Sequence, residues 1–151
     1  MRQSLSENER AAPAARAVWV AAALSAVLAV AAMIDQLGVH SLTDHANAMY
    51  EPYGKRPDPG LLYGLVYAVA VVGALLWLPV IRVVRSRSRL APVLAVVVIT
   101  VTAALAVLLL VSTEYDAQIF PPLWGTLAIL PPAVGVLAVV LLFRRASGHV
   151  Q

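Results

Sequence analysis

The residues best suited to chemistry lie in one polar stretch, residues 35–60, and in a shorter acidic segment, residues 112–122. The first stretch holds two of the three histidines, four of the eight carboxylates and the only lysine. Imidazole and carboxylate together are the usual ligand set of zinc, manganese and iron sites. Because the HExxH spacing of a metallopeptidase is absent, solvated loop residues without a metal or other cofactor are the competing interpretation. The candidate metal ligands are His40, Asp44, His45 and Asp116.

Asp35 is the leading candidate for a catalytic group, with His40 and Glu114 as further acid or base candidates. It directly follows an unbroken apolar run and is expected near the depth of Tyr63 or Tyr67. Ionisable groups at membrane depth are functional candidates by default. A carboxylate at the rim of a span can equally accept a structural hydrogen bond from one of these tyrosines or from a loop amide. Both interpretations stay open on the sequence alone.

A ligand could also be bound along the second apolar segment, where Tyr63, Tyr67 and Trp77 share one face at helical spacing. A phenol inside a membrane boundary needs a hydrogen-bond partner, which a ligand or a neighbouring helix could supply. Farther along, Pro131 and Pro132 remove two backbone donors inside the fourth apolar segment. We therefore expect that segment to kink or break, either for packing or to expose backbone groups to a ligand.

The composition requires membrane-spanning elements to position these residues. Apolar residues make up 61% of the chain and charged residues 13%, against about 25% charged in a typical soluble domain. Four runs are long enough to cross a bilayer as helices. The sequence predicts an all-α, four-transmembrane-helix bundle, and the absence of cysteine excludes thiol chemistry. The predicted spans are residues 17–34, 61–81, 90–111 and 123–143, between polar tails at residues 1–16 and 144–151.

The first loop is predicted to contain a short interfacial helix. Ser41 and Asp44 have the spacing of a capping-box variant, which places the start of this helix at Ser41. Asp58 followed by Pro59 suits the cap and first residue of the next span. The apolar face of the short helix would lie against the end of the bundle; its members are Leu42, His45, Ala46, Met49 and Tyr50.

Single side chains add two smaller expectations. Phe120 and Trp124 are placed in the aromatic belt at a membrane boundary. Thr100 and Thr102 are the only polar side chains of the third span and are expected to return their hydroxyls to their own helix.

Basic residues predict the orientation. Nine of the eleven lie in the two tails and the second loop, whereas six of the eight carboxylates lie on the opposite side with only Lys55 and Arg56. The positive-inside rule then places both termini in the cytoplasm and residues 35–60 outside. This asymmetry explains the net charge of +3 without a nucleic-acid partner.

The predicted spans lack a charged relay. No Asp, Glu, Lys, Arg or His lies in the middle of any span, whereas proton-coupled exporters and ion pumps need an ionisable group there. The sequence thus disfavours a proton-driven transporter.

Two stretches carry a family resemblance: DQLGVHSLTDHANAMYEPYGKRPDPGLLYG at residues 35–64 and ALLWL at residues 74–78. They resemble the first outer loop and the second helix of four-helix integral membrane proteins of actinobacterial type. The resemblance implies the fold and a bacterial plasma membrane, and it implies no activity.

The resulting functional expectation is a non-enzymatic accessory or oligomer-forming subunit. Its partners would be the lipid bilayer and either further copies or another membrane protein, with small residues such as Ala29 and Gly64 in close helix contacts. One alternative is a membrane enzyme or sensor that binds a lipidic ligand or a metal at the outer boundary. A second alternative is an oligomeric pore.

Overall fold

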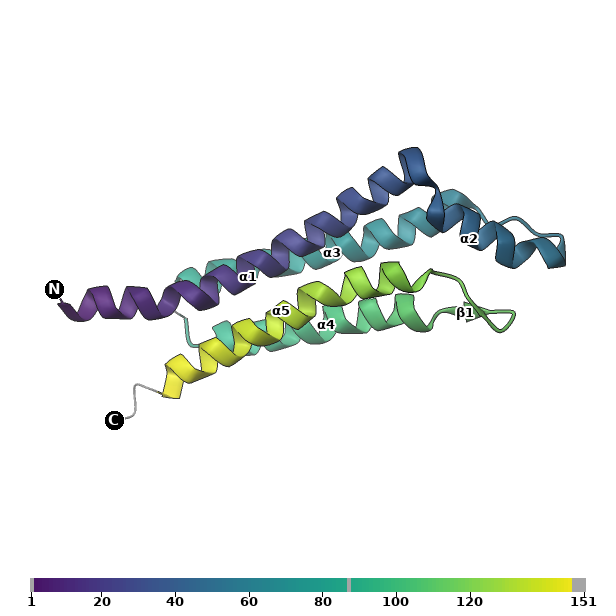
Figure 1. Cartoon of the computed structure of the whole chain (residues 1–151). Coiled ribbons are helices and arrows are strands. Elements are labelled where there is room, and N and C mark those ends of the chain that lie inside the picture. The colour runs from purple at the N-terminus through teal and green to yellow at the C-terminus, as the bar shows by residue number, and fades with distance from the viewer. Residues whose placement is uncertain (1, 87, 148–151) are drawn as a thin grey trace.

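Four long helices run the length of the molecule in the computed structural model, which describes residues 2–86 and 88–147, with side chains for residues 12–86 and 88–144. The first turns of α1 and the last turns of α5 lie at the same end of the bundle (Figure 1). Arg87, counted among the basic residues above, falls outside the described residues, as do Met1 and residues 148–151. The long helices are α1 (Arg2–Ile34), α3 (Pro59–Arg85), α4 (Ala91–Val111) and α5 (Pro122–Ser147).

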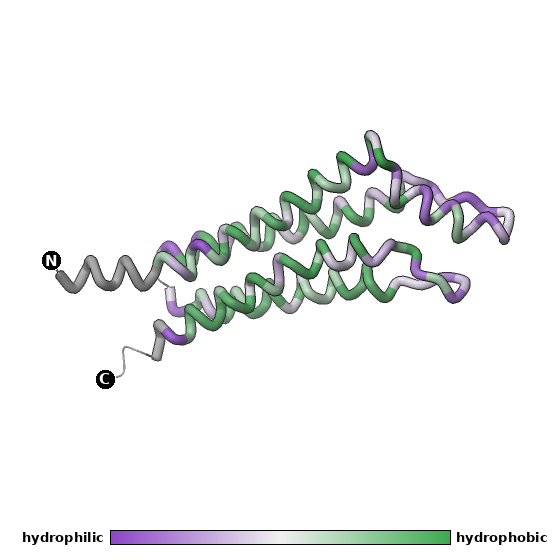
Figure 2. The backbone as a smooth tube through the Cα atoms, viewed as in Figure 1, coloured by the Kyte–Doolittle hydropathy of each residue, from purple (hydrophilic) through white to green (hydrophobic). Residues whose placement is uncertain are grey.

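These helices form a four-helix bundle, as predicted. Helix α1 packs against α3 and α5, and α4 packs against α5 and α3, so that α3 and α5 lie on one diagonal. Figure 2 shows apolar residues along the bundle and polar residues concentrated at its ends. Among the described residues, four segments are long and apolar enough to cross a membrane, in agreement with the predicted fold class: Ala12–Val39, Pro59–Arg85, Ala91–Val111 and Pro122–Arg144.

The bundle core consists of two clusters stacked along its length. One contains Tyr63 and Trp124 and lies toward the loop that follows α1. The other surrounds Trp77, toward the chain termini. Many large apolar side chains on all four helices face outward, which a lipid-facing surface requires.

The N-terminal polar segment, predicted as a tail through Arg16, is helical. Helix α1 begins at Arg2 and continues through Pro13. Alanine, glutamate and arginine are strong helix formers and need no apolar face to extend an existing helix. The sequence interpretation relied on apolar periodicity and therefore began the helix too late.

Helix α5 continues through Pro131 and Pro132 as one helix, so of the predicted kink or break, the break is wrong and the kink stays a prediction. Membrane helices tolerate proline where neighbouring helices, hydroxyl side chains or ordered water replace the lost donors. Packing of α5 against α1 and α4 favours the continuous helix.

The connections at one end form a lobe, defined as residues 41–58 and 112–121, that extends beyond the bundle (Figure 1). It contains the predicted short helix, α2 (Ser41–Tyr50), then the 3-10 turn η2 (Glu51–Tyr53). A hairpin of β1 (Thr113–Glu114) and β2 (Ala117–Gln118) completes it. Leu42, Ala46 and Tyr50 are the buried side of α2, which confirms its amphipathic face.

Phe120 and Trp124 do not form the expected lipid-facing belt. They are 3% and 2% exposed and share the core cluster with Leu42 and Leu62. Helix α2 and the first turn of α3 cover these two side chains. The sequence predicted that α2 lies against the end of the bundle, but not that it buries Phe120 and Trp124.

Candidate functional site

Asp35 lies at the base of the lobe and joins three segments of the chain. Its Oδ2 accepts hydrogen bonds from the Tyr63 hydroxyl at 2.7 Å and the Leu42 amide at 3.1 Å, and its Oδ1 accepts from the Ser41 amide at 3.0 Å. The residue is 6% exposed. Both a tyrosine and loop amides thus bind the carboxylate, which are the hydrogen bonds that the structural interpretation expects.

The backbone between Asp35 and Ser41 makes this contact possible. After α1 the chain forms the π-helical turn η1 (Asp35–Val39), and His40 then adopts the left-handed conformation with φ 59°. This reversal turns the first amides of α2 back toward Asp35. The predicted capping box is therefore incorrect, because His40 is the N-cap of α2 and makes no side-chain capping bond. Asp35 satisfies the free amides of the first turn from outside the helix.

Two polar contacts connect α2 to the hairpin. The Nε2–H of His45 donates to the Gln118 carbonyl at 2.9 Å. The Tyr50 hydroxyl donates to the Glu114 carboxylate. That carboxylate favours the protonated phenol and raises the pKa of Tyr50 to about 12. Both bonds tie the first loop to the second across more than sixty residues of sequence.

An aromatic cluster forms the tip of the lobe. Tyr115 stacks on Tyr53, with ring centroids 3.9 Å apart and planes 19° apart. The Lys55 ammonium donates to the Tyr115 hydroxyl at 2.5 Å, and this bond raises the pKa of Lys55. Tyr115 and Asp116 have φ values of 53° and 61°, the pattern of a type I′ hairpin turn.

The side chains of the three catalytic candidates have separate hydrogen-bond partners, although the His40 amide donates to the Asp35 carbonyl at 2.7 Å. Asp35 serves α2 and α3, Glu114 binds Tyr50, and the Nδ1–H of His40 donates to the Gly38 carbonyl at 3.0 Å. Within the described part of the chain, no group of three or more His, Asp or Glu residues is placed to hold a metal ion. The metal candidates His40, at the base of the lobe, and Asp44, His45 and Asp116, within it, therefore form no such group.

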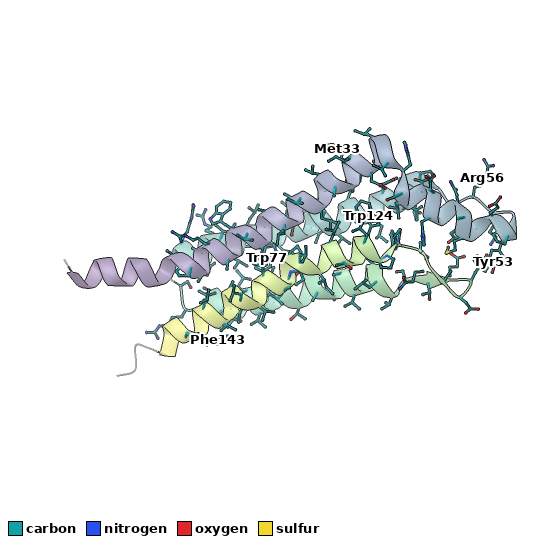
Figure 3. The ribbon with its side chains drawn as sticks, in the orientation of Figure 1. Met33, Tyr53, Arg56, Trp77, Trp124 and Phe143 are labelled. Carbon is teal, nitrogen blue, oxygen red and sulfur yellow. The ribbon has the colours of Figure 1, made fainter. Side chains whose placement is uncertain are left out.

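The three ligand-binding candidates also have separate surroundings. Tyr63 binds Asp35, and the Tyr67 hydroxyl donates to Gln36 Oε1 at 2.9 Å. Trp77 is fully buried, and its Nε1–H has no acceptor among the described residues. Figure 3 shows Trp77 in the middle of the bundle and Trp124 nearer the lobe. The aromatic face predicted on α3 thus packs and hydrogen-bonds within the protein.

The sequence interpretation missed a polar hollow of about 500 Å³ on the lobe surface. The hollow holds Lys55 and Arg56, the two basic residues at this end of the bundle, together with acidic and amide groups. Figure 3 shows Tyr53 and Arg56 at the tip of the lobe. The sequence signal was the Gly54-Lys55-Arg56 run, where Gly54 has φ 63° and turns the chain. The lining residues are Asn47, Glu51, Gly54, Lys55 and Arg56.

The fold and these contacts define a helical protein with four potential membrane spans and a lobe whose two loops are joined by hydrogen bonds. No protein-family model matches the chain, and no curated protein or solved structure matches it either. Function must therefore be argued from the geometry alone.

Proposed function

We propose that this chain is a non-enzymatic accessory subunit of a bacterial plasma membrane, whose lobe is a docking surface for a partner. The proposal rests on the hydrogen bonds that the reactive side chains make within the protein. Asp35, His45 and Glu114 each bind an amide, a carbonyl or a phenol of the same chain. Groups engaged in this way hold a surface in shape, whereas an acid or base catalyst must reach a substrate.

The proposed orientation places the lobe outside and both termini in the cytoplasm. Arginines at the opposite end, among them Arg82, Arg85 and Arg144, satisfy the positive-inside rule. Arg85 lies 5.4 Å from the ring centroid of Trp19, and Trp19 is half exposed. An exposed tryptophan beside an arginine suits the headgroup region of a bilayer. No nucleic acid is involved in this proposal.

The hollow beside Lys55 and Arg56 is the proposed docking surface. These two cations lie at the end of the bundle where the other charged side chains are acidic. Arg56 is exposed and makes no hydrogen bond or ion pair with any described residue. Tyr53 is 49% exposed, with one ring face against Tyr115. A cationic hollow next to an aromatic ring favours a partner surface that presents carboxylates, either a second copy or another membrane protein.

Arg56→Glu and Arg56→Lys form the matched pair that tests the proposal, because Arg56 makes no hydrogen bond or ion pair with a described residue that its replacement would break. We expect native mass spectrometry of the full chain released from detergent to show a second copy or a partner chain. Arg56→Glu should lose this species, and Arg56→Lys should keep it. Thermal unfolding of both variants should match that of the unmodified protein. A monomer that carries a stoichiometric metal or one defined lipid would instead support the enzyme or sensor alternative.

A further inference from the structure

The double proline of α5 creates a hydrogen-bonding deficit inside the bundle. Pro132 has no N–H, so the carbonyl of Ala128, four residues earlier, lacks its usual helical donor. Helix α5 nevertheless continues without a break. Ala128 is 4% exposed, and the hydrocarbon around the bundle offers no water to its carbonyl. A replacement donor must come from within the bundle.

A small cavity between the two core clusters is lined by Ala128 and by Pro131, one turn farther along α5. The centre of a water-sized sphere can occupy about 10 Å³ of it, at the lower edge of the ~10–15 Å³ that one water molecule requires. Ala128 and Pro131 line it from α5, Ser25 from α1, Gly73 from α3 and Thr102 from α4. All four helices of the bundle therefore meet at this cavity.

Ser25 is the hydroxyl best placed to serve the cavity. It is 2% exposed, and its hydrogen bond to the Ala21 carbonyl is long at 3.3 Å. Thr102 instead makes a short bond of 2.8 Å to the Val98 carbonyl. Gly73 leaves the space open, because a Cβ at this position would lie 3.1 Å from Ser25 Oγ. Ser25 can thus exchange a weak backbone bond for a stronger partner in the cavity.

We propose that one structural water molecule occupies this cavity and bridges the Ser25 hydroxyl to the Ala128 carbonyl. The water accepts from Ser25 Oγ and donates to the Ala128 oxygen, which gives it two of the two to four partners that buried waters have. The bridge ties α1 to α5 at mid-bundle and replaces the donor that Pro132 lacks.

A double-mutant cycle with Ser25→Ala and Pro132→Ala tests the bridge on the full-length chain in detergent. The Pro132→Ala substitution would give the Ala128 carbonyl a helical N–H, so the bridge would no longer be needed. We expect Ser25→Ala alone to lower the folding equilibrium constant roughly three- to tenfold. In the Pro132→Ala background this loss should shrink to within about twofold. The difference between the two backgrounds measures the coupling between Ser25 and Pro132.

Thr100→Val is the matched control, since the Thr100 hydroxyl bonds the Val96 carbonyl at 3.0 Å on the exposed side of α4. Its effect should be the same in the unmodified chain and in the Pro132→Ala background. High-resolution density of the unmodified protein gives an independent readout, with a water peak expected between Ser25 Oγ and the Ala128 oxygen. Equal effects of Ser25→Ala in both backgrounds would overturn the proposal, as would a direct contact of the two oxygens without a water.

Discussion

The Tyr63 hydroxyl donates to Asp35 Oδ2 across 2.7 Å, a contact that links the end of α1 to the first turns of α3. The same carboxylate accepts the Ser41 and Leu42 amides of α2. One side chain thus fixes the positions of three helices where the lobe leaves the bundle. This relationship explains why Asp35 is buried without a cationic partner: three donors replace the water it loses.

Asp35→Asn should destabilise the fold more than Tyr63→Phe does. The asparagine NH₂ group would face a donor, which leaves buried groups unpaired at a cost of about 1–3 kcal/mol. Tyr63→Phe removes a single donor and should cost about 1 kcal/mol. The measurement is the free energy of unfolding in detergent, with Asp116→Asn on the exposed turn as a control that should change little. Wild-type stability together with lost biological activity in Asp35→Asn would instead indicate a catalytic carboxylate.

The lobe should lose stability between about pH 10 and pH 12. The pKa of Tyr50 is raised from 10.0 to about 12 in the folded protein by its bond to Glu114. Below pH 10 both the folded and unfolded states keep the phenol proton, so this contribution is fully present. As the pH rises further, the unfolded state loses the proton first and stability falls. Amide exchange of the hairpin should follow this pH dependence, and Tyr50→Phe should reduce it to the part that Lys55 contributes through its own raised pKa. A Tyr50 phenol that titrates near pH 10 would contradict the assignment.

Gly135→Ala and Gly64→Ala should have opposite effects. A Cβ at Gly135 would lie 2.5 Å from Trp77 Cη2 and 2.8 Å from Ile99 Cγ1, and such overpacking typically costs about 1–3 kcal/mol. A Cβ at Gly64 meets nothing within 4 Å, so alanine should be neutral or gain up to ~1 kcal/mol from helix propensity. Thermal unfolding of the two variants side by side gives the comparison. Equal destabilisation would indicate that Gly64 faces a second copy.

Asp116→Gly should leave the lobe intact. Asp116 occupies the left-handed region with φ 61°, which glycine adopts without steric cost. We expect unfolding within about 0.5 kcal/mol of the unmodified chain, as for most exposed substitutions, and unchanged exchange of the hairpin amides. Metal titration monitored by calorimetry provides the second readout. Heat of zinc binding that disappears in Asp116→Gly would restore the metal-site interpretation.

Much of the architecture could be predicted from local sequence. Apolar length identified the four spans, and Asp58 with Pro59 marked the start of α3: the Asp58 side chain accepts from the Gly60 amide at 2.8 Å. The threonine expectation is also confirmed, because Thr100 and Thr102 bond carbonyls of their own helix. Each of these features depends on residues that are close together in the sequence.

The errors concern features that depend on tertiary contacts. Gly135 packs against Trp77, a close approach that the sequence interpretation did not identify, whereas the contact expected of Gly64 with a further copy or a partner stays a prediction. The left-handed turn at His40 gave α2 a cap from Asp35 instead of from Ser41. Neither outcome has a local signature, since both follow from how the helices are rotated and where the chain reverses.

Amide hydrogen exchange at Ser41 and Leu42 tests the central claim most directly, namely that Asp35 holds the lobe in place. In the full-length chain in detergent, these two amides should be protected. In Asp35→Asn their exchange should accelerate by roughly tenfold or more, because the weakened capping bonds allow α2 to open. The protection of amides in the middle of α4 should be unchanged. Exchange at Ser41 and Leu42 that is equally fast with and without the substitution would contradict the account, because Asp35 would then be free to serve a substrate.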